Sequence, residues 1–266
     1  TTKLTNSIVA NLFYEPSTCT QNSFSIASQK LGLYTLNPVM NNLSSVKGES
    51  LLDTITTLEQ MRVNLFVIRH PDNFTPHFIA NEIATPIINA GDGTNHHPSQ
   101  ALIDLFTITQ TYPSIKNIKI AILGDIMHSR VARSAIALFS KMGCHEINLV
   151  CPPEFSPTPQ PENTRIYHNL HDGLKECDVV IALRIQTERI KDAKKLNKKN
   201  FHDTFGLTAE SIQYAKKGAI ILHPGPINRG IEIESQIADG PQSKINQQVR
   251  NSIPTRMAII EHILQA

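Results

Sequence analysis

The sequence predicts an α/β fold with two doubly wound domains, each with a central parallel sheet flanked by helices. Short apolar runs alternate with longer amphipathic segments along the whole chain, which is typical of parallel strands joined by crossover helices. The chain has 266 residues, of which 40% are hydrophobic. At roughly 150 residues per domain, this length favours two cores over one.

The first half of the chain contains three apolar runs that we expect to be strands. They are SIVANLFY at 7–14, VNLFVIR at 63–69 and TPIINAG at 85–91. Segments with helical character follow the first and the third run, at 22–32 and 99–112. This order predicts one parallel sheet with crossover helices.

The second half repeats the alternation with four longer apolar runs. Strands are expected at 117–125, 146–153, 178–184 and 218–226, with a short strand at 164–169 and helices at 129–143 and 171–177. The Pro-rich stretch 152–164 lies between two expected strands, so we interpret it as a surface loop.

The domain boundary is expected in the segment TYPSIKN. Pro113 ends a helical pattern there, and a new buried strand begins at Ile118. We therefore predict domains at 1–113 and 114–251. A C-terminal helix is expected at 252–266, with Ser252 near its cap, packing back on the first domain.

Composition excludes several classes of protein. The net charge is +2. A short run of lysines is interpreted as a solvated face, and nucleic-acid binding is the alternative. The run comprises Lys194, Lys195, Lys198 and Lys199. The four cysteines form no CxxC pair, which predicts reduced thiols and a cytoplasmic protein with no disulfide framework. No apolar run approaches the ~18 residues of a membrane span, and the start of the sequence lacks the pattern of a secretion signal.

Polar side chains follow the ends of six expected strands, where ligands of open parallel sheets bind. The first such loop, PSTCT, places the hydroxyls of Ser17, Thr18 and Thr20 at a strand-to-helix turn that favours an anion. Taken alone, the loop is better explained by an ordinary helix cap. The loop lacks GK[ST], and the strand before GDIMHSR lacks GxGxxG, which argues against a nucleotide hydrolase and a dehydrogenase.

Seven motifs occur in an order and spacing that resemble the aspartate/ornithine carbamoyltransferase family, over residues 9–233. They are FYEPSTCTQNSF, SSVKGESLLDT, VIRHP, NHHPSQALIDL, GDIMHSRVARS, LRIQTER and LHPGPINRG. The resemblance implies transfer of a carbamoyl group from carbamoyl phosphate to an amino acid, without a metal or an organic cofactor. The chain has HPGP where ornithine-specific members usually have HCLP, so L-aspartate is the expected acceptor and pyrimidine synthesis the expected pathway.

The resemblance also implies the site residues. His97 and Gln100 of the HPxQ motif would bind the carbamoyl group. Arg130 and Arg184 would bind the two carboxylates of aspartate. Lys47 would reach into the active site of an adjacent subunit in a homotrimer and bind the substrate's phosphate there. Arg133 and Arg189 are expected to be solvated. The remaining implied residues are Thr20 and Arg69 for catalysis, and Ser17, Thr18, Cys19, Ser44, Gln186, Pro224, Gly225 and Pro226 for substrate binding.

Two positions depart from the family's PSTRTR pattern. Cys19 and Gln21 stand where the family has arginines. A thiol cannot replace a bidentate cation, and losing one such contact costs about 1.5–3 kcal/mol of binding. The alternative expectation is therefore a catalytically impaired paralogue that acts as a structural or regulatory partner in a pyrimidine-pathway assembly.

Overall fold

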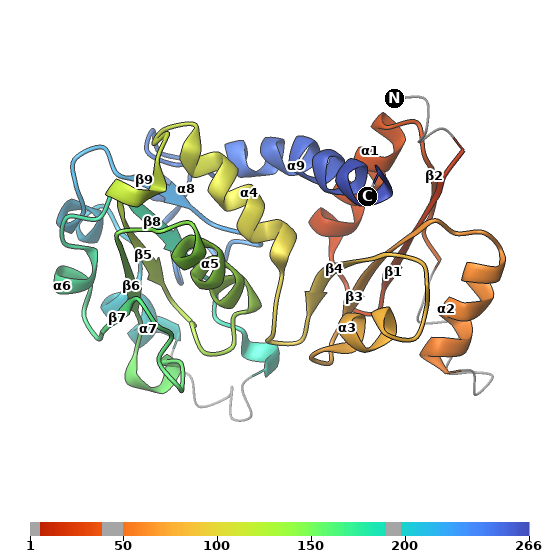
Figure 1. Cartoon of the computed structure of the whole chain (residues 1–266). Helices are drawn as coiled ribbons and strands as arrows, with labels where there is room; N and C mark the ends of the chain where they lie inside the picture. Colours follow the sequence, from red (N-terminus) through yellow and green to blue (C-terminus); the bar gives the residue numbers. More distant parts are fainter. Residues whose placement is uncertain (1–5, 39–49, 190–197, 266) are drawn as a thin grey trace. The chain divides into compact units, whose positions relative to one another are not determined.

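The structure, a computed structural model, describes residues 6–38, 50–189 and 198–265 (Figure 1). The contacts divide the chain into one unit of residues 1–99 and 250–266 and a second unit of residues 100–249. The division falls near the start of helix α4 (Pro98–Thr109), whereas the boundary after residue 113, which stays a prediction, lies beyond this helix.

The first unit contains a parallel sheet in the order β2-β1-β3-β4. Its side chains alternate between two apolar clusters: Val9 and Val67 face one cluster, and Ala10 and Phe66 the other. A sheet that is buried on both faces in this way needs helices on both sides. The strands are β1 (Ile8–Phe13), β2 (Tyr34–Leu36), β3 (Leu65–His70) and β4 (Ile87–Asp92).

Helix α1 and the C-terminal helix cover one face of this sheet, because Phe24, Ala27 and Ile260 share the cluster of Val9. Ile55 and Ile79, from α2 and α3, belong to the cluster on the other face. The helices of this unit are α1 (Thr18–Lys30), α2 (Leu51–Gln60) and α3 (Thr75–Ala80).

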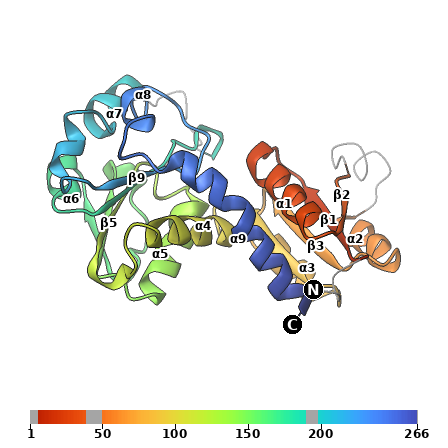
Figure 2. The same cartoon turned by 90° about the horizontal axis from the view of Figure 1, so that it is seen from above.

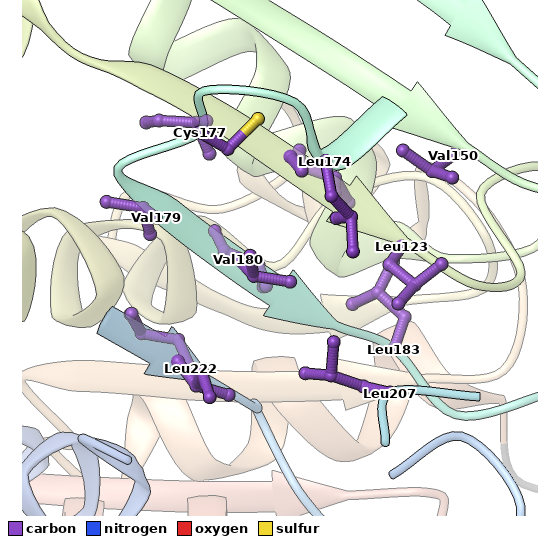
Figure 3. Packing of buried hydrophobic residues seen from close by; sticks show 14 of the residues in the cluster. Leu123, Val150, Leu174, Cys177, Val179, Val180, Leu183, Leu207 and Leu222 are labelled. Carbon is purple, nitrogen blue, oxygen red and sulfur yellow. The ribbon is translucent and has the colours of Figure 1, made fainter. Parts of the chain in front are cut away.

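The second unit contains a parallel sheet in the order β7-β6-β5-β8-β9. Its inner strand β8 is a continuous apolar run, and every residue of β8 is buried. Figure 3 shows Val179 and Val180 of β8 among leucines from the neighbouring elements. The strands are β5 (Lys119–Leu123), β6 (Glu146–Val150), β7 (Thr164–Tyr167), β8 (Val179–Ala182) and β9 (Ile220–Leu222).

Helices flank the second sheet on both faces, and Figure 2 shows α4 and α5 on one side of it and α7 and α8 on the other. The α-helices are α5 (Arg130–Lys141), α6 (Leu170–Leu174), α7 (Lys198–Phe205) and α8 (Ser235–Ala238). The short 3-10 helices are η2 (Ile115–Asn117), η3 (Pro153–Phe155), η4 (Thr187–Arg189) and η6 (Ser211–Tyr214). The predicted fold class is thus confirmed in both units.

The last helix, α9 (Ile245–Gln265), begins earlier than expected. Its start was expected at Ser252, because serine is favoured as an N-cap residue and the apolar positions after it have helical spacing. The structure instead has Pro254 inside the helix. Ile245, Gln248 and Asn251 are buried at helical spacing, and this buried stripe extends the helix upstream of Ser252.

None of the helices in the described part of the chain combines the length and the apolar character needed to cross a lipid bilayer.

Candidate active site

Four of the predicted site residues lie near the topological switch points of the two sheets, where ligands of open α/β sheets bind. In the first unit the chain passes from β1 outward to β2 and returns on the other side at β3. In the second unit it passes from β5 to β6 and β7, and returns at β8. Ser17 follows β1, Arg69 lies near the end of β3, Arg130 begins the helix after β5, and Arg184 follows β8.

The turn after β1 leads into helix α1 with its first N–H groups uncapped by a side chain. Ser17 is the N-cap residue, but its side chain makes no capping hydrogen bond. The alternative of an ordinary side-chain cap is therefore not what the structure has. Thr18 and Cys19 are exposed in the first turn, and Thr20 is buried. Free N–H groups and the helix dipole together attract an anion.

Arg69 is the next-to-last residue of β3 and lies next to this turn, since β1 and β3 are paired up to Phe13 and Arg69. Its Nε atom donates to Glu15 Oε1 over 2.7 Å, and both side chains are largely buried. Because the Nε edge of the guanidinium is held by Glu15, this ion pair fixes the direction of the Arg69 side chain.

His97 follows β4 in a loop that is shaped by the buried carboxylate of Asp92. That carboxylate accepts hydrogen bonds from the backbone N–H groups of Phe74 and His96 and from the amides of Asn89 and Asn95. Burial alone would raise the pKa of Asp92, but these hydrogen bonds outweigh it and lower the pKa. The histidine loop is thus held by an ionised carboxylate that the sequence analysis did not single out.

In the second unit, the loops after β5 and β8 touch through Gly124. Its φ angle is +125°, and a Cβ atom there would lie 2.4 Å from the carbonyl oxygen of Leu183, so only glycine fits. The next residue, Asp125, is fully buried and accepts from the backbone N–H of Gln186 over 3.0 Å. It also accepts from the backbone and ring of His128. Asp125 therefore ties together the loops that carry Arg130 and Gln186.

The arginine of the β8 loop is already engaged within the loop. Arg184 forms two hydrogen bonds with Glu188, one of them at 3.0 Å between Nη1 and Oε2. These bonds raise the pKa of Arg184 and lower that of Glu188. Arg189 was expected to be solvated, but it is partly buried and donates to Gln186 Oε1 over 3.0 Å, so it orients that amide.

Arg130 is the first residue of helix α5 and is buried. Ser129 caps this helix, because its hydroxyl accepts from the N–H of Ala132 over 3.1 Å. Arg133, three residues further along the helix, is exposed as expected. Of the two arginines in this motif, Arg130 is therefore the buried one.

The loop after β9 is fixed by His223. Its Nδ1 atom accepts from the N–H of Gly225 over 2.9 Å, so Nε2 carries the proton and donates to Glu232 Oε1 over 3.1 Å. Glu232 also accepts from the N–H of Asn228 over 2.6 Å. These contacts define the path of the segment 224–226, which contains Pro224, Gly225 and Pro226.

Lys47 and Ser44, expected to serve an adjacent subunit, lie outside the described residues. Residues 6–38, 50–189 and 198–265 contain no group of three or more His, Cys, Asp or Glu side chains that would hold a metal ion.

The fold and these loops define a two-domain α/β protein with arginine and hydroxyl side chains at both switch points. The chain belongs to the aspartate/ornithine carbamoyltransferase family. Residues 1–110 match the family's carbamoyl-P binding domain, and residues 116–263 match its Asp/Orn binding domain.

Curated relatives narrow the similarity to the aspartate branch. The chain is 44% identical over 255 residues to the aspartate carbamoyltransferase catalytic subunit of Vesicomyosocius okutanii, covering 95% of this chain and 80% of that protein. It is 45% identical over 260 residues to the catalytic subunit of the same name from Legionella pneumophila (strain Corby), covering 97% and 87%.

Solved structures agree with the fold. The aspartate transcarbamoylase of Trypanosoma cruzi, in complex with carbamoyl aspartate and phosphate, has a TM-score of 0.83 at 29% identity and covers 97% of this chain and 83% of that chain. The ornithine carbamoyltransferase of Thermus thermophilus has a TM-score of 0.87 at 22% identity, covering 98% and 88%, and shares the fold.

Proposed function

We propose that this chain catalyses transfer of the carbamoyl group of carbamoyl phosphate to the amine of L-aspartate. The products are N-carbamoyl-L-aspartate and phosphate, a step of de novo pyrimidine synthesis. The observation that carries the proposal is the identity of 44–45%, over 95–97% of the chain, to relatives named aspartate carbamoyltransferase catalytic subunits. The HPGP sequence at 223–226 supports aspartate over ornithine.

The first unit would bind the phosphate and polarise the carbamoyl group. Uncapped N–H groups at the start of α1 and the hydroxyls of Ser17 and Thr18 suit the phosphate. Thr20, Arg69 and His97 would donate to the carbamoyl oxygen as it gains negative charge. Cys19 lies in this loop as an exposed free thiol and supplies no fixed charge.

The second unit would recognise the carbamoyl nitrogen and the amino acid. The backbone carbonyls of Pro224 and Gly225 and the amide oxygen of Gln100 are acceptors for the NH2 group. Arg130 and Arg184 would each bind one carboxylate of aspartate, with Gln186 assisting. Because Arg184 already donates hydrogen bonds to Glu188, a carboxylate of aspartate would have to displace the Glu188 carboxylate or bind Arg184 beside it.

The reaction would be a direct attack of the aspartate amine on the carbamoyl carbon. The C–N bond forms, the C–O bond to phosphate breaks, and the departing phosphate can accept the amine proton. Catalysis would then consist of positioning and electrostatic stabilisation by the residues named above.

The active assembly would be a homotrimer in which Lys47 and Ser44 serve the adjacent subunit's site. We propose a cytoplasmic location, since the four cysteines are free thiols, as is usual in a reducing compartment.

The test is an assay for carbamoyl-aspartate with the purified protein and its Cys19→Arg variant. We expect product from the natural chain and a gain of about 10²–10³ in rate from the arginine, the size associated with one preorganised donor. Cys19→Ser is the matched control and should give no gain. Ornithine in place of aspartate should give no citrulline. Failure of both the natural chain and Cys19→Arg, each folded, would overturn the proposal and favour the impaired paralogue.

A further inference from the structure

Helix α4 carries a buried carboxylate, Asp104, to which the transfer reaction assigns no role. The side chain has 0% exposure, and its Oδ1 atom accepts two hydrogen bonds of 2.8 Å from the Nε2 atoms of Gln100 and Gln248. Its Oδ2 atom has no partner among the described residues. An ionised carboxylate only accepts, so both glutamines must turn their NH2 groups toward it. Their amide oxygens therefore face elsewhere.

The oxygen of Gln248 faces the loop after β9. Oε1 accepts from the backbone N–H of His223 over 2.8 Å. His223 in turn receives the N–H of Gly225 at Nδ1. One continuous set of hydrogen bonds thus runs from Asp104 through Gln248 to the loop containing Pro224, all within the second unit.

The oxygen of Gln100 has no hydrogen-bond donor in the described part of the chain. It is the atom that the proposed function assigns to the carbamoyl nitrogen. If the amide were flipped, its NH2 group would face the NH2 group of the substrate, and a favourable contact would become a repulsive one. The contact with Asp104 selects the productive orientation.

We propose that Asp104 is a positioning residue: it holds the amides of Gln100 and Gln248, and thereby fixes both sets of acceptors for the carbamoyl nitrogen. The inference rests on the proposed function. Through the two amides, the carboxylate of Asp104 would favour carbamoyl phosphate, which has the NH2 group, over inorganic phosphate, which lacks it.

Asp104→Asn tests the inference, because asparagine keeps the volume of the side chain but can donate to Gln100 and flip it. The KM for carbamoyl phosphate and the Ki of inorganic phosphate are measured in the same assay. We expect the KM to rise about tenfold, the loss of one ordinary hydrogen bond, while the phosphate Ki stays within twofold. The kcat should fall as well, because the same acceptors hold the carbamoyl group in the transition state.

Asp178→Asn is the matched control. Asp178 is also a buried carboxylate of the second unit, bonded to the N–H of Lys119 and to Lys216, and it contacts neither glutamine. Its substitution should leave the ratio of KM to phosphate Ki unchanged. An equal change of this ratio in both variants, or equal changes of KM and Ki in Asp104→Asn, would overturn the inference.

Gln248→Met keeps the test decisive if Asp104→Asn does not fold. This substitution removes the hydrogen bonds of Gln248 to Asp104 and His223 and leaves the contact between Asp104 and Gln100. We expect a smaller rise in the KM for carbamoyl phosphate, again without a change in the phosphate Ki. An unchanged ratio in Gln248→Met would overturn the inference. Absence of product from the natural chain and from Cys19→Arg would overturn the proposed function and this inference together, whereas product with an unchanged ratio overturns the inference alone.

Discussion

The guanidinium of Arg256 lies 4.8 Å from the centre of the Phe24 ring, in the core of the first unit. It is 2% exposed and has no carboxylate partner among the described residues. It donates to Ser23, whose hydroxyl donates in turn to the carbonyl of Cys19 over 2.6 Å. A buried cation thus lies beneath the first turn of α1, where the proposed phosphate binds.

Arg256→Met should weaken anion binding with little change in stability. Burial lowers the pKa of Arg256 to about 10, a cost of about 3 kcal/mol for keeping the charge. Methionine removes this cost, which offsets the lost hydrogen bond of about 1 kcal/mol and the lost cation–π contact of about 2 kcal/mol. We expect a tenfold rise in the Ki of inorganic phosphate and a free energy of unfolding within about 1 kcal/mol of the natural value. Urea unfolding and inhibition assays measure both; a large stability loss with an unchanged Ki would show a purely structural role.

The stability of the protein should depend on pH through Asp104. Burial raises its pKa to about 6, so between pH 4 and 6 the folded state binds a proton that the unfolded state has released. The free energy of unfolding therefore falls by about 3 kcal/mol as the pH rises from 4 to 7. Asp104→Asn should abolish this component and gain stability relative to the natural chain as the pH rises. Urea unfolding at several pH values measures the difference, and parallel curves for the two proteins would contradict the prediction.

Glu188→Gln should improve the affinity for aspartate. Glu188 is half-exposed and occupies Arg184, the proposed ligand of a substrate carboxylate. Because an ion pair of this exposure contributes about 0–1 kcal/mol, we expect the KM for aspartate to fall by up to about fivefold. Glu210→Gln, at an exposed position of the second unit, is the control and should leave the KM unchanged. A rise in KM for Glu188→Gln would mean that the carboxylate holds Arg184 in its active orientation.

Asp125→Asn should disturb the proposed aspartate loops. The new NH2 group would face the N–H of Gln186 or that of His128, where a carboxylate oxygen now accepts. We expect a loss of about 1–3 kcal/mol in stability and a tenfold rise in the KM for aspartate. Asp178→Asn should cost similar stability without changing this KM. Equal kinetic effects of the two substitutions would refute the local role of Asp125.

Much of the fold could be predicted because the inner strands are buried on both faces. The runs at 63–69 and 178–184 have no polar alternation, and they form β3 and β8. Loops at the ends of parallel strands then placed Arg69 and Arg184 at switch points without any knowledge of their contacts. The start of α9 was missed because Ser252, a residue type favoured at helix N-caps, lies inside the helix.

The residues that orient the site side chains could not be predicted from patterns of neighbouring residues in the sequence. Asp104 meets Gln248 across 144 positions of sequence, and Ser23 meets Arg256 across 233. Asp92 and Asp125 follow strands and carry a local signal, but only the folded loops show which N–H groups they accept. A side chain whose role is to orient another is defined by its partners, and those partners become neighbours only through the fold.

The division of labour between the two sheets has an evolutionary consequence. The groups that would select the amino acid come from the loops after β5 and β8, whereas those for the phosphate follow β1 and β3. The two selections would therefore rest on strands that lie far apart in the sequence and belong to different sheets. A gene duplicate that acquires a new acceptor amine would then carry its substitutions in the loops of the second sheet and inherit those of the first.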